Sequence, residues 1–154
     1  MKKSPATRIE ISVRKQRIIL KAGRKKLAEY PVSTSRFGLG SKEGSFKTPA
    51  GRFRIAEKIG DGMPIGTIFK SREPVRSTKK LLAEDDLIMT RILWLDGLER
   101  RNANTHSRYV YIHGTNHEES LGVPARHGCV RMKNADVAEL YELVKVDTPV
   151  EIKP

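Results

Sequence analysis

Apolar and polar residues alternate along the N-terminal part of the chain with the period of two that is typical of β-strands. Residues 8–13 read RIEISV and residues 16–20 read QRIIL, which predicts two short strands joined by a turn. A turn at GRKK (23–26) leads to a third strand over 27–33. After the turn TPAG, residues 52–57 predict a further strand.

The second half of the chain predicts two more strands of greater length. Residues 87–95 form a largely apolar run that ends at the turn DGLE. The clearest strand is SRYVYIHGT (107–115), with its two tyrosines and its histidine on one face and valine and isoleucine on the other. Between them, glycines and prolines in residues 60–86 indicate loops, although TKKLLAEDD has the composition of a short helix.

One helix is predicted near the C-terminal end. Asn134 is expected to cap it, because the apolar residues that follow have the helical spacing i, i+3, i+4 and i+7. These residues are Val137, Leu140, Tyr141 and Val144. A last strand is expected over 150–152. The pattern as a whole predicts a mainly β fold with one clear helix, and residues 1–154 contain no repeat or linker that would divide this single domain.

The composition fits a globular protein of this size. The chain has 154 residues and a mass of 17.4 kDa, with 38% hydrophobic and 31% charged residues. Its single cysteine excludes an internal disulfide and a four-cysteine zinc site. No segment is expected to span a membrane, because the apolar runs LIM (87–89) and ILWL (92–95) are interrupted by Thr90, Arg91 and Asp96.

The positive charge is concentrated in one part of the chain. The net charge is +12, and residues 1–60 hold 16 Lys/Arg against 4 Asp/Glu, whereas residues 61–154 hold 14 of each. A basic half is compatible with a nucleic-acid-binding module. However, aromatic residues make up only 6% of the chain, and no RNA-stacking motif is present. We therefore expect no nucleic acid among the partners.

The N-terminal sequence MKKSPATRIEISVRK has a basic start but no apolar core, so it does not resemble a secretory signal. We expect a cytoplasmic protein if Met1 is the native start. A periplasmic or cell-wall location is expected if a signal peptide was removed.

The strongest candidate for chemistry is the segment RHGCVRM (126–132), which holds the only cysteine. Polar groups and cations surround Cys129, where a thiol would tend to ionise. His127 and Arg131 lie two residues to either side of it, and His113 ends the predicted strand 107–115. A cysteine with a histidine from elsewhere in the chain is the arrangement used for acyl transfer.

Several ordered motifs resemble the L,D-transpeptidase (YkuD-like) catalytic domain family. They are IHGT (112–115), GVPARHGCVRM (122–132) and DTPVEI (147–152), preceded by YPVSTS (30–35) and GSFKTPAGRFRI (44–55). The resemblance covers about residues 8–152. It implies a β-sandwich or barrel with the helix after the catalytic cysteine. It also implies an enzyme that forms a thioester with a peptidoglycan stem peptide, releases a terminal D-amino acid, and passes the acyl group to an amine or to water. Covalent inhibition by carbapenem-type β-lactams is implied as well.

Carried over by position, the resemblance makes Cys129 the nucleophile and His113 the general base. The carbonyl of Gly114 would orient the histidine ring.

The same resemblance assigns the surroundings of the thiol. His127, Gly128 and the N–H of Cys129 would line the oxyanion site. Arg131 would hold the loop or the substrate, and Tyr111 is expected to line the cleft as a substrate-binding residue.

One position departs from the family pattern. Arg126 stands where the family usually has Ser or Thr. An arginine there could hold the free carboxylate of a terminal D-residue in a bidentate grip. Together with the absent signal sequence, this favours a cytoplasmic L,D-carboxypeptidase that trims muropeptides during wall recycling. The alternative is an L,D-transpeptidase that forms cross-links with an amine acceptor.

A zinc site is a competing interpretation of the same histidines. His113, His117, His127 and Cys129 include suitable ligand types. However, HGTNH lies at a strand end rather than on a helix with the glutamate of HExxH. We therefore expect no metal and no other cofactor.

Overall fold

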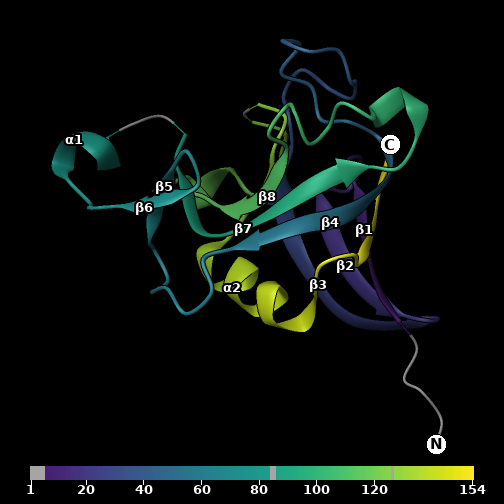
Figure 1. Cartoon of the computed structure of the whole chain (residues 1–154), viewed down its shortest axis with the longest axis horizontal. Coiled ribbons are helices and arrows are strands. Elements are labelled where there is room, and N and C mark those ends of the chain that lie inside the picture. Colours follow the sequence, from purple (N-terminus) through teal and green to yellow (C-terminus); the bar gives the residue numbers. More distant parts are fainter. Residues whose placement is uncertain (1–5, 84–85, 126) are drawn as a thin grey trace, which may run out of the picture.

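The computed structural model describes residues 6–83, 86–125 and 127–154, and β-strands dominate it (Figure 1). The strands are β1 (Thr7–Ser12), β2 (Arg17–Ala22), β3 (Lys25–Ser33), β4 (Gly51–Ile59), β5 (Ile68–Lys70), β6 (Glu73–Val75), β7 (Ile88–Gly97), β8 (Tyr111–Gly114), β9 (Val130–Met132) and β10 (Pro149–Lys153). The helices are α1 (Lys79–Leu82) and α2 (Asn134–Leu143), with 3-10 turns at Arg100–Asn102 and Glu118–Ser120.

The sheet closes on itself into a barrel. Its strands follow the order β4-β10-β1-β2-β3-β9-β8-β7, and β7 returns to pair with β4. The short hairpin β5–β6 continues from β7 outside this ring, at the left of Figure 1. The predicted mainly β barrel or sandwich with a helix after the cysteine is thereby confirmed.

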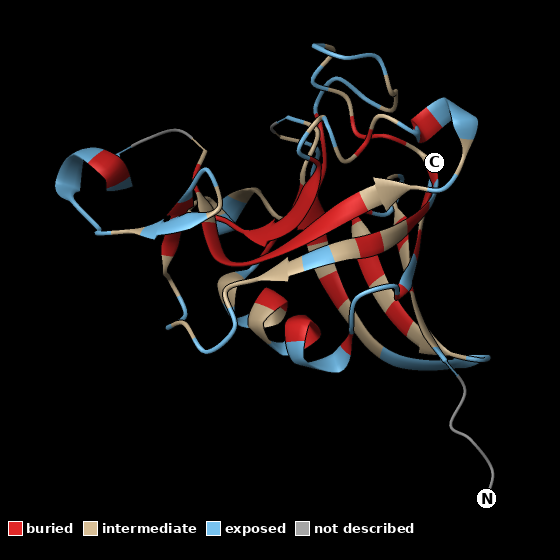
Figure 2. Cartoon of the chain, viewed as in Figure 1, coloured by how far each residue is buried: buried red, intermediate tan, exposed pale blue. Residues whose placement is uncertain are grey.

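The interior of the barrel is filled by one continuous apolar cluster. Figure 2 shows its buried positions recurring along the strands, as the alternation in the sequence requires. The cluster contains Ile9, Ile11, Ile18, Leu20, Val32, Phe53, Ile55, Leu93, Leu95, Ile112, Val130 and Met132, among others. Helix α2 packs against β7 and β8 and adds Val137, Leu140 and Tyr141 to the same cluster. This packing fixes β8 and β9, which carry the candidate site.

A second apolar cluster lies on the outer face of β7 and β8. Leu93 and Leu95 point into the barrel, so the alternate residues Ile92 and Trp94 point outward. Ile92 and Trp94 pack with Phe69 of β5 and with Tyr111 of β8, and Cys129 lies against this cluster. The hairpin β5–β6 therefore covers the face of the sheet on which the only thiol lies.

Most of the predicted strands are present, with bounds that differ by a few residues. The strands predicted at 8–13, 16–20, 27–33, 52–57 and 87–95 correspond to β1, β2, β3, β4 and β7. The strand predicted over 107–115 is shorter, since only Tyr111–Gly114 is extended. Tyr109 has a φ of 57° and is 53% exposed, so its predicted place on the strand face was wrong.

The helix starts differently from the prediction. Lys133 occupies the cap position, and Asn134 is the first helical residue. The Asn134 side chain instead donates a hydrogen bond to the carbonyl of Thr115 at 2.8 Å and accepts one from the Thr90 hydroxyl at 2.6 Å. It therefore ties the start of α2 to the strands on either side of it.

Candidate active site

Cys129 precedes β9 and is held between two backbone groups of the neighbouring chain segment. The N–H of Tyr111 donates to the Cys129 sulfur at 3.3 Å, and the thiol donates to the carbonyl of Tyr109 at 3.4 Å. Because β8 and β9 run parallel with Ile112 opposite Val130, Tyr111 lies beside Cys129. The left-handed backbone at Tyr109 turns its carbonyl towards the thiol, which a regular strand would not do.

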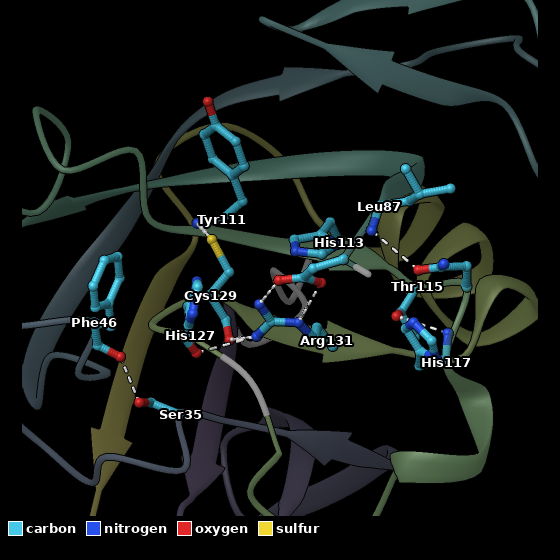
Figure 3. A network of polar contacts seen from close by, with 12 residues as sticks. Ser35, Phe46, Leu87, Tyr111, His113, Thr115, His117, His127, Cys129 and Arg131 are labelled. Atoms are coloured by element: carbon cyan, nitrogen blue, oxygen red, sulfur yellow. Dashed lines mark hydrogen bonds and ion pairs between the residues drawn. The ribbon is translucent and has the colours of Figure 1, made fainter. Parts of the chain in front are cut away.

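His113 lies two residues further along β8, on the same face as Cys129 (Figure 3). It is 1% exposed, and its Nδ1 lies 2.5 Å from the carbonyl oxygen of Gly114. A carbonyl can only accept, so Nδ1 carries the proton and Nε2 is left as an acceptor. The predicted orientation by Gly114 therefore has its contact in the structure, and the ring is prepared to take a proton.

The surroundings of His113 keep its ring neutral. Burial and the positive charge of Arg131 lower the pKa of His113 to about 4, outweighing the Gly114 carbonyl and the Asp86 carboxylate. At neutral pH the imidazole is therefore uncharged, as a general base must be.

The thiol is also neutral at rest. Burial raises the pKa of Cys129 above its ordinary value, and the Arg131 charge and the Tyr111 N–H only partly offset this effect. The expectation that this thiol tends to ionise was therefore wrong, because desolvation outweighs the nearby cation. Cys129 and His113 are therefore both uncharged at neutral pH.

Arg131 lies inside the protein rather than in the cleft. Its guanidinium forms an ion pair with Asp86, including a 2.9 Å bond from Nε. Its Nη1 donates to the carbonyls of His127 at 3.1 Å and Cys129 at 2.9 Å (Figure 3). Of the two roles expected for Arg131, the geometry fits the holding of the loop. Its side chain is only 3% exposed, and its assignment as a substrate-binding residue stays a prediction.

Gly128 lets the cysteine loop approach a second loop closely. A Cβ at this position would lie 2.6 Å from the carbonyl oxygen of Lys47. That carbonyl accepts a 2.9 Å hydrogen bond from Nη2 of Arg108, whose Nη1 lies 3.4 Å from the carbonyl of Gly40. Arg108 thus ties this second loop in place beside Cys129. It was missed in the sequence, where it reads only as a cation before a strand.

The thiol opens into a cleft of about 290 Å³. Its lining includes Glu43, Phe46, Arg108, Tyr109, His127, Gly128 and Cys129. The exposed ring of His127 stacks on Phe46, with the ring centroids 4.4 Å apart. Phe46 has a φ of 57° and was not singled out in the sequence. The oxyanion role of His127 and Gly128 stays a prediction.

Tyr111 and Arg126 are the other predicted substrate-binding residues. The Tyr111 side chain is buried in the outer cluster, and its backbone N–H donates to the thiol, so its predicted role in substrate binding stays a prediction. Arg126 lies outside the described residues.

The zinc interpretation gains no support. Within the described ranges, no group of three or more His, Cys, Asp or Glu residues is placed to hold a metal ion. His117 instead bonds Glu119 through Nδ1 at 2.9 Å. No helix in the described part of the chain is long and apolar enough to cross a membrane.

A thiol that lines a cleft and a buried neutral imidazole lie on the same face of parallel strands in a closed barrel, an arrangement consistent with a cysteine enzyme. The model of the L,D-transpeptidase catalytic domain, YkuD, matches residues 6–152. The chain therefore belongs to the L,D-transpeptidase (YkuD) family, and it is an enzyme of the peptidoglycan-related group that this family represents.

Known proteins of this family are similar over part or all of the chain. YqjB of Bacillus subtilis, which carries an L,D-transpeptidase name, is 46% identical over 48 residues, or 31% of this chain and 27% of YqjB. The fold matches an L,D-transpeptidase from Mycobacterium smegmatis with a TM-score of 0.62 and 16% identity, over 97% of this chain and 59% of that one. L,D-transpeptidase 3 from Mycobacterium tuberculosis, solved with a faropenem-derived adduct, matches with a TM-score of 0.62 and 16% identity. The match covers 97% of this chain and 61% of that one. The chain thus spans only part of the length of these relatives.

Proposed function

We propose that this protein is an L,D-carboxypeptidase that removes the terminal D-alanine from peptidoglycan stem tetrapeptides through a thioester. The observation that carries the proposal is that a neutral thiol at Cys129 and a buried His113 ring with an unprotonated Nε2 lie on the same face of the parallel strands β8 and β9. This state matches the reactant state of a general-base-assisted thiol attack.

In the first step the Cys129 sulfur attacks the carbonyl of the L-diamino acid, and its proton passes to Nε2 of His113. The C–N bond to D-alanine then breaks, and the same proton goes to the leaving amine. The Gly128–Cys129 backbone stabilises the oxyanion. In the second step water attacks the thioester, His113 takes its proton, and the thiol is restored as the tripeptide leaves.

Water is proposed as the acceptor partly because of the size of the cleft. A volume of about 290 Å³ is at the lower end of the range for small-ligand sites. It offers room for the end of one peptide but little for a second one. Cross-linking with an amine acceptor remains the alternative reaction of the same thioester.

Mass spectrometry tests the reaction. Wild type and Cys129→Ala are incubated with a disaccharide tetrapeptide, with and without an added D-amino acid. Loss of one D-alanine in the wild type only is the expected result. Exchanged or cross-linked products would establish the amine-acceptor reaction instead, and turnover by Cys129→Ala would refute the mechanism. Melting curves of both proteins serve as the folding control.

Covalent capture by a carbapenem is part of the proposal. The Mycobacterium tuberculosis relative forms a faropenem-derived adduct, and another solved relative is in complex with imipenem. We expect a mass increase of one inhibitor per chain in the wild type and none in Cys129→Ala.

The cellular place of the reaction is proposed to be the cytoplasm, in the recycling of soluble muropeptides. Cell fractionation followed by detection of the protein checks this. Recovery in the periplasmic or wall fraction would contradict it.

A further inference from the structure

The turn that joins β5 to β6 has a left-handed backbone at two residues that are not glycine. Lys70 pairs with Glu73, so Ser71 and Arg72 form a two-residue loop, with φ angles of 48° and 66°. Hairpin turns with positive φ at both central residues strongly favour Asn-Gly. An arginine there is conformationally costly, and such strain tends to persist where a side chain has a function.

The turn directs the Arg72 guanidinium onto an aromatic platform. It lies 5.0 Å from the centre of the Trp94 ring and 5.2 Å from that of Tyr109. Its Nη1 donates to the hydroxyl of Tyr111 at 3.3 Å. Trp94 is itself held by His106, whose ring is parallel to it at 4.0 Å and whose carbonyl accepts from its Nε1. The guanidinium is therefore held against two aromatic rings by cation–π contacts and by one hydrogen bond.

This platform borders the thiol directly. Tyr111 donates its N–H to the Cys129 sulfur, and Tyr109 accepts from the same thiol. The residues under the guanidinium of Arg72 are thus the ones that flank the nucleophile. Two tyrosines connect the cation to the place where the scissile bond must lie.

The charge of Arg72 has no ion-pair partner among the described residues, and its one hydrogen bond there uses Nη1. The Glu57 carboxylate has only a weak Coulombic interaction with the Arg72 guanidinium, and it is hydrogen-bonded to His106 at 2.9 Å. The donors on Nε and Nη2 therefore form no hydrogen bond within the described part of the chain. Two donors on one edge match the two oxygens of a carboxylate.

We propose that Arg72, stacked on Trp94 and Tyr109, is a carboxylate subsite that binds the free carboxylate of the terminal D-residue of the substrate. This inference rests on the proposed function and adds the feature that selects a chain end. It assigns to Arg72 the role that the sequence suggested for Arg126.

The test compares wild type, Arg72→Asn and Arg126→Ser on two substrates, the tetrapeptide and the same peptide with a C-terminal amide. Asparagine tolerates left-handed backbone, so Arg72→Asn is expected to melt at or above the wild-type temperature. Arg24→Asn, at the distant β2–β3 turn, is the matched control.

The wild type should favour the free acid over the amide by roughly 10- to 100-fold in kcat/KM, the value of a charge-assisted pair. In Arg72→Asn this ratio should fall towards one, through a higher KM for the acid. A ratio that stays at the wild-type value in Arg72→Asn, or that collapses only in Arg126→Ser, would overturn the inference.

Binding to the inactive protein separates this inference from the proposed function. Calorimetry with Cys129→Ala and with Cys129→Ala/Arg72→Asn needs no turnover. If the wild type cleaves neither substrate, the proposed function fails. The subsite is then still supported by a loss of tetrapeptide binding in the double variant, and refuted by equal binding.

Discussion

Acidification should destabilise the folded protein through the buried imidazole of His113. The ring is 1% exposed, and its pKa is lowered to about 4 from an ordinary 6.5. In the unfolded chain the same ring takes up a proton near its ordinary pKa. The stability that depends on a neutral ring is therefore complete above pH 6.5 and is lost as the pH falls towards 4. At pH 4 the loss from this group amounts to about 3 kcal/mol.

Urea denaturation at a series of pH values between 7 and 4 measures this loss. Carboxylates that titrate in the same window affect wild type and His113→Gln alike, so the difference between the two isolates the ring. The free energy of unfolding of the wild type should fall relative to that of His113→Gln by about 3 kcal/mol over this range. Parallel curves for wild type and His113→Gln would refute the reasoning. On the same grounds, kcat/KM should have its acid limb near pH 4.

Three further substitutions test the close approach of the two loops and the ion pair of Arg131. Gly128→Ala places a Cβ 2.6 Å from the backbone oxygen of Lys47 and should slow acylation by a β-lactam at least about 10-fold. In the control Gly40→Ala, the new Cβ meets only the flexible side chain of Lys47, at 2.8 Å, so the acylation rate should stay near that of the wild type. An equal loss of acylation rate in Gly128→Ala and Gly40→Ala would contradict the role of the close approach at Gly128. Asp86→Asn leaves the guanidinium of Arg131 without its charge partner and should cost about 2 to 3 kcal/mol, since the carboxylate is 26% exposed. The urea midpoint of Asp86→Asn measures this loss of stability, and an unchanged midpoint would mean that the ion pair does not stabilise the fold.

The strands that could be predicted are those with one face in the barrel. Alternation identified β1, where buried and less buried residues alternate over its second half, and turn residues located β3 and β4. The hairpin β5–β6 was not predicted, because Ser71-Arg72 lacks the glycine or asparagine by which such turns are recognised. The strand before His113 was predicted too long, because nothing in the sequence around Tyr109 indicates its left-handed backbone.

Some residues of the candidate site could likewise be predicted from the sequence, and others could not. Cys129 and His113 could be singled out because ordered motifs mark them. The position of Arg131 could not be, because its partner Asp86 lies 45 residues earlier and the two meet only through the tertiary fold. Arg108 was missed for the same reason, as its acceptors belong to a distant loop. The charge state of the thiol depends on burial, which no local pattern reports.

The pairing of β1 with β10 also determines when an active molecule exists. Ile9 lies beside Val150, so the ring of strands requires the two ends of the domain to meet. Contacts between such distant positions form slowly, typically in milliseconds to seconds. During synthesis the histidine and the cysteine emerge before β10, and the barrel stays open until that strand is available. The barrel that positions Cys129 and His113 should therefore stay incomplete until the whole domain has left the ribosome.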